Sequence, residues 1–343
     1  MTAWNELADS RKLQLPAFAF TSGGRGSVKL HCRTLGTLNN AGDNAVLLLH
    51  GTTGSSLQFL KSETADFLFG QGQPLDQNDY FVIMPDAIGH GESSKPSDEL
   101  GESFPQYSYS DIVAAQHAIV HDLFGIDRLR LVLGTSMGGM QTWMWGIRYP
   151  KMMDALMPIA CLPERLSGIN LLFRRLMLAM IRSDPQYADS ELSPPSHGVG
   201  LAWNLFQLMI NSQARLAEDF KDPDRADRHI WQIVKEAEST QKAVDVIWEF
   251  NASCDYDPGS DLENIEAPLL SVNFSDDVIN SPQFDVLNHD IQRVRYGRAV
   301  TIDAGGKAQG HQTLAHAEVW GQYVGELLTE TSSPPTTQLF SKE

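Results

Sequence analysis

The 343-residue chain has few cysteines, no long apolar run and few basic residues. Its three cysteines, Cys32, Cys161 and Cys254, lie far apart and form no Cys-x-x-Cys or Cys/His cluster. This spacing argues against a disulfide framework and against a zinc site. No stretch of about 18 apolar residues is present, and the first residues lack the basic and then apolar pattern of a signal peptide. We therefore expect three reduced thiols in a soluble, cytoplasmic protein.

The shortage of basic residues limits the class of partner. Lysine and arginine number 26 against 43 aspartates and glutamates, which gives a formal net charge of −17 at pH 7. A field of this sign repels phosphate backbones and anionic lipid headgroups. We expect a small-molecule partner, with no nucleic acid and no membrane surface, and we leave a homodimer open.

Short apolar runs, each long enough for one buried strand, recur along the chain. Segments with helical periodicity lie between them, such as residues 110–125, where Ser110 is a candidate N-cap and Gly125 a candidate end. Alternating strands and helices favour a doubly wound, mostly parallel sheet. The predicted strands are 44–50, 80–87, 129–136, 153–161, 268–275 and 298–304.

The alternation stops after Cys161. Residues 162–250 contain no convincing strand but have apolar residues at helical spacing. We interpret this segment as a helical cap inserted into an α/β core made of residues 1–161 and 251–343. A chain of this length can hold one such core with a cap.

A serine lies between small residues directly after one predicted strand. The segment Gly134-Thr135-Ser136-Met137-Gly138 has the G-x-S-x-G spacing of a nucleophile elbow, a sharp turn from strand to helix that exposes the serine side chain. The same spacing also occurs by chance in glycine-rich turns. Ser136 is therefore a candidate nucleophile that needs a base, an acid and an oxyanion site.

Backbone donors for an oxyanion are expected at two strand ends. Strand 44–50 ends in the glycine-flanked turn His50-Gly51-Thr52-Thr53-Gly54. We favour the backbone N–H of Thr52 as one donor and that of Met137, the residue after the nucleophile, as the other. The alternative is an ordinary turn at the end of a strand.

Two adjacent aspartates, Asp276 and Asp277, follow strand 268–275. We predict that Asp276 orients the base, because it comes first after the strand, and that Asp277 faces solvent. Asp277 is the second choice and Asp257 a remote third. The alternative is that the pair caps the next helix, a frequent role of aspartate.

The candidate base follows the last predicted strand. His311 lies in a loop next to Gly310, and we predict that it accepts the serine proton. His316 is the rival, but its segment has the pattern of a helix, so we expect an ordinary helical residue there. His50 and His90 are expected in turns, where they can support the site.

The three candidates occur in the order Ser136, Asp276, His311, each beyond a predicted strand. This order is that of α/β-hydrolases. In such a triad the histidine takes the serine proton while the serine attacks an acyl carbon, and the aspartate fixes the imidazole tautomer. An acyl-enzyme results, and this chemistry requires no metal and no organic cofactor.

Longer motifs resemble one branch of this superfamily. The segments "HGTTGSS", "NDYFVIMPD", "GTSMGGMQTWMWGIRYP" and "GHQT" are similar to homoserine O-acetyltransferases. The likeness covers most of residues 44–161 and resumes over 255–330, whereas the cap matches only in being helical. It implies an α/β-hydrolase fold, with Ser136 as nucleophile, Asp276 as acid, His311 as base and Thr52 as first oxyanion donor.

Two departures from that branch bear on the substrate. The transferases carry an aspartate after the catalytic histidine, implied in holding the amino group of homoserine, and this chain has Gln312. The segment "PDAIGHGESSKP" is also more similar to ordinary esterases. Some members of the branch are carboxylesterases, so we expect a serine carboxylic-ester hydrolase acting on small acyl esters.

Two alternatives remain open. The first is an O-acyltransferase that uses acetyl-CoA, supported by Arg174 and Arg182, which lie eight residues apart in a predicted cap helix. At this i, i+8 spacing we place the two on one helix face, where they could contact coenzyme A phosphates, although a solvated helix face explains them as well. The second is a non-catalytic protein that keeps the fold.

Overall fold

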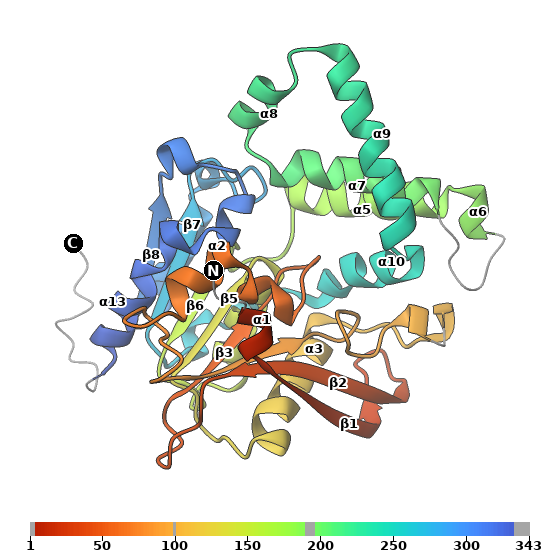
Figure 1. Cartoon of the computed structure of the whole chain (residues 1–343). Coiled ribbons are helices and arrows are strands. Elements are labelled where there is room, and N and C mark those ends of the chain that lie inside the picture. The colour runs from red at the N-terminus through yellow and green to blue at the C-terminus, as the bar shows by residue number, and fades with distance from the viewer. Residues whose placement is uncertain (1–3, 99–100, 189–195, 333–343) are drawn as a thin grey trace.

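The structure is a computed structural model that describes residues 4–98, 101–188 and 196–332 (Figure 1). Within these ranges, eight strands form one sheet in the order β1-β2-β4-β3-β5-β6-β7-β8. The strands are β1 (Asp9–Ala19), β2 (Arg25–Leu35), β3 (Ala45–Leu49), β4 (Phe81–Asp86), β5 (Leu131–Thr135), β6 (Leu156–Ile159), β7 (Leu269–Phe274) and β8 (Gly297–Ile302).

The parallel part of the sheet is the part that the sequence predicts. Five of the six predicted strands contain β3 to β7, and the sixth, 298–304, overlaps β8, which begins one residue earlier; β3 to β8 pair in parallel. β1 and β2 were not predicted; they form an antiparallel hairpin, and β2 also pairs antiparallel with β4. The fold is therefore the predicted mostly parallel α/β-hydrolase sheet, extended at one edge by this hairpin.

Helices cover both faces of the sheet. One apolar cluster joins one face to α1 (Trp4–Leu7), α2 (Ser62–Leu68), α12 (Ala317–Trp320) and α13 (Gln322–Glu330). A second cluster joins the other face to α3 (Tyr109–Ala118) and α4 (Met137–Arg148). Side chains alternate between the two clusters along β3, where Val46 belongs to the first and Leu47 to the second. β3 to β7 are thus buried on both faces, which explains their continuous apolar residues.

The predicted helix 110–125 begins earlier than expected. Its N-cap is Ser108, not Ser110, because the Ser108 side chain accepts from the backbone N–H of Asp111 and the Asp111 carboxylate accepts from the backbone N–H of Ser108. The helix continues into a π-helical turn, Ile119–Leu123. Gly125 then adopts a φ of 66° at the predicted end.

In the described part of the chain, six α-helices lie between β6 and β7, and we call them the cap helices. They gather at the top of the view in Figure 1, where α8 and the start of α9 project furthest. α5 packs on α7 and α10, and α7 packs on α9. The cap helices are α5 (Gly168–Arg182), α6 (Pro185–Ala188), α7 (His197–Ile210), α8 (Gln213–Asp219), α9 (Pro223–Thr240) and α10 (Ala243–Asn251). The short α11 (Val286–Asp290) lies between β7 and β8.

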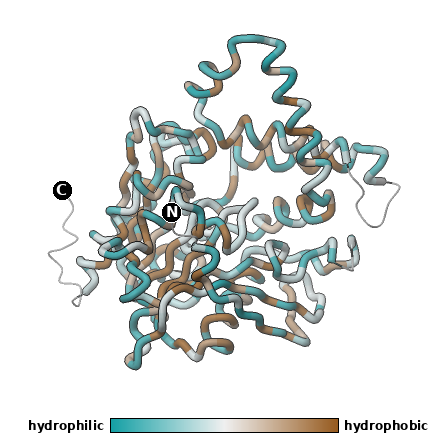
Figure 2. The backbone as a smooth tube through the Cα atoms, in the orientation of Figure 1, coloured by the Kyte–Doolittle hydropathy of each residue, from teal (hydrophilic) through white to brown (hydrophobic). Residues whose placement is uncertain are grey.

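Hydropathy follows this arrangement. Hydrophobic residues gather on the strands and on the inner sides of the helices, whereas α8 and the outer part of α9 are largely hydrophilic (Figure 2). In the described part of the chain, no helix is both long enough and apolar enough to cross a bilayer.

Candidate active site

Ser136 occupies a sharp turn between β5 and α4. Its φ of 53° and ψ of −113° lie outside the regions that ordinary residues favour. Two glycines make the turn sterically feasible. A Cβ at Gly134 would lie 2.1 Å from the Gly138 carbonyl oxygen, and one at Gly138 would lie 2.0 Å from the Leu49 carbonyl oxygen. The sequence therefore folds into a strained turn of the nucleophile-elbow type, which exposes the Ser136 hydroxyl.

The structure brings Ser136 and His311 together although they lie far apart in the chain. Nε2 of His311 is 2.8 Å from Oγ of Ser136, and Nδ1 is 2.7 Å from a carboxylate oxygen of Asp277. A carboxylate only accepts, so Nδ1–H donates to Asp277. This tautomer leaves Nε2 free to accept the proton of the Ser136 hydroxyl.

The prediction that Asp276 contacts His311 is wrong. β7 ends at Phe274, and the backbone N–H of Asp277 bonds to the Phe274 carbonyl, so a tight turn directs the second aspartate inward. Asp277 is 1% exposed. Asp276 instead accepts from the backbone N–H of Gly310 at 2.7 Å. Asp276 thus holds the loop that carries His311, and Asp277 holds the imidazole.

Asn280 is a site residue that the sequence analysis missed. Its backbone N–H and its side-chain amide both donate to Asp277, and the amide also donates to the Ala160 carbonyl. Burial raises the pKa of the Asp277 carboxyl, but the neighbouring His311 and the bonds from Asn280 outweigh burial and hold the pKa below its usual value. Asp277 therefore stays ionised and can stabilise a positive charge on His311.

The two predicted oxyanion donors are the backbone N–H groups of Thr52 and of Met137, which directly follows Ser136. Met137 is the first residue of α4, so its N–H has no acceptor within the helix. Thr52 and Ser136 line the same cavity. Among the described residues, no acceptor is found for the N–H of Thr52 or of Met137. Both donors are therefore available to a ligand, and their action on an oxyanion is part of the proposal below.

Buried side chains hold the turn that carries Thr52. His90 Nε2 lies 2.7 Å from the Thr52 carbonyl, and His50 Nε2 accepts from the Ala87 backbone N–H. Burial lowers the pKa of His90 to about 3 and also lowers that of His50, so both rings are neutral at pH 7. Gln58, which the sequence analysis missed, accepts from the Gly51 N–H and donates to the Thr135 hydroxyl. Gln58 thus links the Thr52 turn to the end of β5, directly before Ser136.

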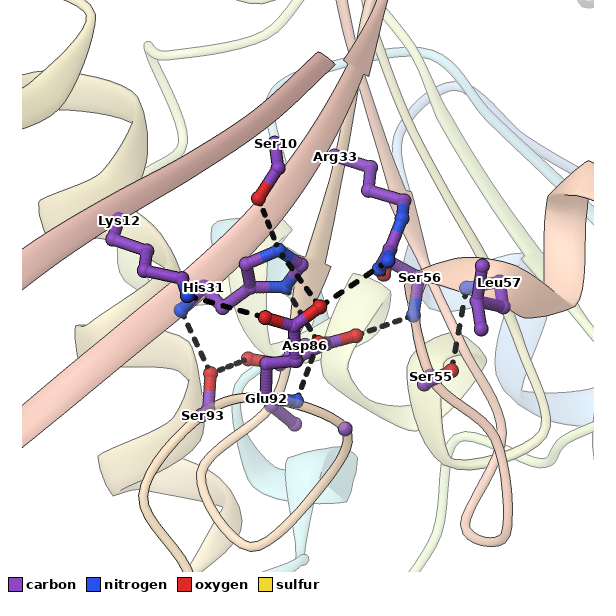
Figure 3. A network of polar contacts seen from close by, with 12 residues as sticks. Ser10, Lys12, His31, Arg33, Ser55, Ser56, Leu57, Asp86, Glu92 and Ser93 are labelled. Atoms are coloured by element: carbon purple, nitrogen blue, oxygen red, sulfur yellow. Dashed lines mark hydrogen bonds and ion pairs between the residues drawn. The ribbon is translucent and has the colours of Figure 1, made fainter. Parts of the chain in front are cut away.

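A carboxylate at the end of β4 ties this region to the sheet edge (Figure 3). Asp86 accepts from the backbone N–H of Ser56 at 2.6 Å and from that of Glu92 at 2.9 Å. His31 of β2 lies 2.7 Å from the same carboxylate through Nδ1. Burial raises the pKa of Asp86, but the His31 bond and the two backbone donors outweigh it and lower the pKa far below its usual value. The network fixes the loops on both sides of β4.

A cavity of about 640 Å³ lies between the sheet and the cap helices and includes Ser136 and His311 in its wall. The wall also contains Gln312 and His316. His316 is the N-cap of α12, not an interior helical residue as expected. Cap side chains complete the wall; they are Asn170, Phe173, Arg174, Phe206 and Ile210.

The three cysteines are unpaired; Cys32 and Cys161 are buried and Cys254 is exposed. Within the described residues, no group of three or more His, Cys, Asp or Glu side chains is placed to hold a metal ion.

Comparison with known proteins agrees with the fold. The sequence profile described as the alpha/beta hydrolase fold matches residues 44–192, which include β3 to β6 and Ser136. A solved acetylester hydrolase from Corynebacterium glutamicum superimposes with a TM-score of 0.80 at 19% identity, covering 94% of this chain and 96% of that one. The chain has the fold of the α/β-hydrolase superfamily. It is an enzyme of that superfamily, and the resemblance stated from its motifs is confirmed at this level.

Relatives of this α/β-hydrolase carry names of two activities. A homoserine O-succinyltransferase of Magnetococcus marinus is 32% identical over 57% of the chain and 55% of its own length. The match thus spans about half the length of curated relatives such as this one. A solved homoserine O-acetyltransferase from Bacillus anthracis superimposes with a TM-score of 0.81 at 21% identity, covering 95% of this chain and 99% of that one. The sequence relatives are consistent with the homoserine acetyltransferase-like branch, and the solved structures include esterases and a transferase of the same fold.

Proposed function

We propose that this α/β-hydrolase is a serine carboxylic-ester hydrolase that acts on small acyl esters. The hydrogen-bonded series from Ser136 through His311 to Asp277, in the wall of the cavity, carries the proposal. In the first step His311 Nε2 takes the Ser136 proton as Oγ attacks the ester carbon. The backbone N–H groups of Thr52 and Met137 stabilise the oxyanion of the tetrahedral intermediate.

Collapse of this intermediate breaks the ester bond. His311 returns the proton to the leaving alcohol, and the acyl group stays on Ser136. A water molecule then attacks the acyl-enzyme, and His311 takes its proton. The bond between the acyl carbon and Ser136 Oγ breaks, His311 returns the proton to Oγ, and the carboxylic acid is released. Asp277 stays ionised throughout and stabilises the transient imidazolium.

The side chains around the cavity favour water over an amino alcohol as acceptor. Gln312, a neutral amide, follows His311 where the transferases carry an aspartate. Glu63 is the one carboxylate among the described residues of the cavity wall, and it is exposed. Arg174 adds a buried positive charge. An ammonium group would enter this cavity without a buried counter-charge, which is unfavourable.

An acyltransferase is the second candidate. It is supported by the names of the sequence relatives, homoserine O-succinyltransferase and homoserine O-acetyltransferases. Acylation of Ser136 is the first half of the reaction for both the ester hydrolase and the acyltransferase. The two functions differ only in the molecule that accepts the acyl group from Ser136.

The first test uses p-nitrophenyl acetate and butyrate with the wild type and Ser136→Ala. We expect the alanine variant to lose at least about 10³-fold in kcat, because no other group supplies a covalent route. Ser55→Ala is the matched control, since Ser55 lines the same cavity but caps the short helix at Ser56–Leu60. It should stay within about threefold of the wild type. Activity of Ser136→Ala within tenfold of the wild type would refute the proposal.

A further inference from the structure

Arg174 lies on the buried side of an amphipathic helix. The buried stripe of α5 includes Phe173, Met177, Leu178 and Ile181, and Arg174 lies among these apolar residues with 5% of its surface exposed. Such a position normally holds an apolar side chain. A fully charged group there therefore needs a specific reason.

The guanidinium of Arg174 is only partly satisfied by the protein. Its Nε donates to the Asn170 side-chain oxygen at 3.0 Å, and its Cζ lies 5.7 Å and 5.4 Å from the ring centroids of Phe173 and Phe250. Nη1 is buried and has no hydrogen-bond partner in the described part of the chain. No carboxylate of the described residues lies within ion-pair distance of it.

These contacts hold the cation without neutralising it. Cation–π contacts and one hydrogen bond from an amide position a guanidinium, but an unpaired buried donor and an unpaired charge both cost free energy. The neighbouring Tyr109 hydroxyl is buried close to Arg174 and to Thr52, but no hydrogen bond of good geometry joins it to either side chain. Burial raises the pKa of Tyr109 and the nearby Arg174 counteracts this rise, so the tyrosine is neutral and supplies no counter-charge.

Arg174 and Asn170 face the same cavity as the nucleophile. Both line it together with Ser136 and His311. Asn170 accepts from Arg174 through its oxygen, which leaves its amide N–H groups as further donors at the cavity wall. An acyl group bound to Ser136 would therefore lie in the same cavity as the positive charge of Arg174 and the amide N–H groups of Asn170.

We propose that Arg174 binds a carboxylate carried by the ester substrate, so that the preferred substrates are esters with one negative charge. This inference rests on the proposed ester-hydrolysing function. The planar guanidinium fits a carboxylate, and a charge-assisted bond from Nη1 would complete its coordination. A single buried cation matches one negative charge better than a phosphate dianion, because the lysine of the cavity wall, Lys61, is exposed.

The alternative of coenzyme A phosphates bound by Arg174 and Arg182 together is not supported. The two arginines lie about 12 Å apart along the helix axis and about 80° apart around it, so their side chains can differ in burial. Arg182 is exposed and is absent from the described wall of the cavity, whereas Arg174 is buried in it.

The test compares charged and neutral esters of matched length. For a carboxylate on the acyl side, monoethyl adipate is compared with ethyl hexanoate; for one on the alcohol side, 4-acetoxybutanoate is compared with butyl acetate. In the wild type we expect kcat/KM for the charged member of one pair to exceed that for its neutral partner by at least about tenfold. The pair that shows this preference identifies the side that carries the carboxylate.

Arg174→Gln should lower this ratio at least about tenfold, mainly through KM for the charged ester. Arg175→Gln is the matched control, because it removes the same charge from the exposed side of α5. It should keep the wild-type ratio. Arg174→Lys, which keeps the charge, should restore part of the preference.

Two outcomes overturn the inference while the proposed function stands. One is that the wild type hydrolyses the esters with Ser136 but has similar kcat/KM values for the charged and the neutral member of both pairs. This result does not depend on the folding of an Arg174 variant. The other is an unchanged preference in Arg174→Gln. Absence of Ser136-dependent turnover of every ester would overturn the proposed function, and this inference with it.

Discussion

At the scale of single residues, the identity of the acid depends on one position in a turn. The sequence predicts an acid after β7, and an acid is found there, but the chain offers two adjacent aspartates. Only the turn that bonds the Asp277 N–H to Phe274 decides which one is buried against His311. Such a turn depends on contacts with Asn280 and Gly310, which are remote from any local pattern.

Replacing the two aspartates by asparagine tests this assignment. Asp277→Asn removes the charge and favours the wrong tautomer of His311, so kcat should fall by about 10³–10⁴-fold. Asp276→Asn loses one acceptor for the Gly310 N–H and should stay within about tenfold of the wild type. Steady-state kinetics with p-nitrophenyl acetate measures both, and a larger loss for Asp276→Asn would return the role to that residue.

Arg174 shows a similar limit of sequence reasoning. Helical spacing predicts correctly that residues near 174 form a cap helix. It does not reveal that an arginine lies on the buried stripe, because the apolar neighbours of α5 come from α7 and α10, far along the chain. Gln58 and Asn280 were missed for the same reason: a polar side chain gains its role only from the partners that the fold supplies.

At the scale of elements, the strands that the sequence predicts are those with continuous apolar residues. β3 to β7 are fully buried, and their composition reflects this. β1 is exposed along most of its length and contains charged residues and Pro16, so no apolar run marks it. The hairpin of β1 and β2 is stabilised because β2 pairs with β4 at the edge of the parallel strands. This is a tertiary contact that the local sequence does not reveal.

The packing of α4 against β3 gives a test of the nucleophile turn. Alanine normally stabilises a helix by about 1 kcal/mol relative to glycine. Gly138→Ala should instead lower the free energy of unfolding by at least about 2 kcal/mol, because its Cβ would meet the Leu49 backbone.

Gly306→Ala is the control for this change, since a Cβ there meets no atom within 4 Å. It should change the free energy of unfolding by less than about 1 kcal/mol. Urea unfolding at pH 7 measures both variants. Equal stability of Gly138→Ala and the wild type would mean that α4 does not approach β3 as described.

At the scale of the whole molecule, the Asp86 carboxylate makes the free energy of unfolding depend on pH. Its hydrogen bonds hold loops next to the candidate active site. The folded pKa of Asp86 lies below the value in the unfolded chain, near 4. Its contribution to stability is therefore complete above about pH 4 and is lost as the pH falls toward the folded pKa. Asp86→Asn should lower the free energy of unfolding at pH 7 by about 1.5–3 kcal/mol.

The difference between the wild type and Asp86→Asn should then shrink as the pH falls below about 4. Urea unfolding at pH 7, 5 and 3 measures it. Asp127→Asn is the control, because the Asp127 side chain is 90% exposed. A difference that stays constant or grows toward pH 3 would contradict the low folded pKa of Asp86.

The acceptor of the acyl group is the central question for the whole enzyme. The wild type is supplied with p-nitrophenyl acetate or acetyl-CoA as donor and homoserine as acceptor, and the products are quantified. Both donors form the same acetyl-Ser136. The ratio of acetate to O-acetylhomoserine then depends only on whether water or homoserine attacks this acyl-enzyme. Since Gln312 and Arg174 leave an ammonium without a buried counter-charge, free acetate should form faster than O-acetylhomoserine with either donor. O-Acetylhomoserine forming faster than acetate would contradict the hydrolase and establish the acyltransferase.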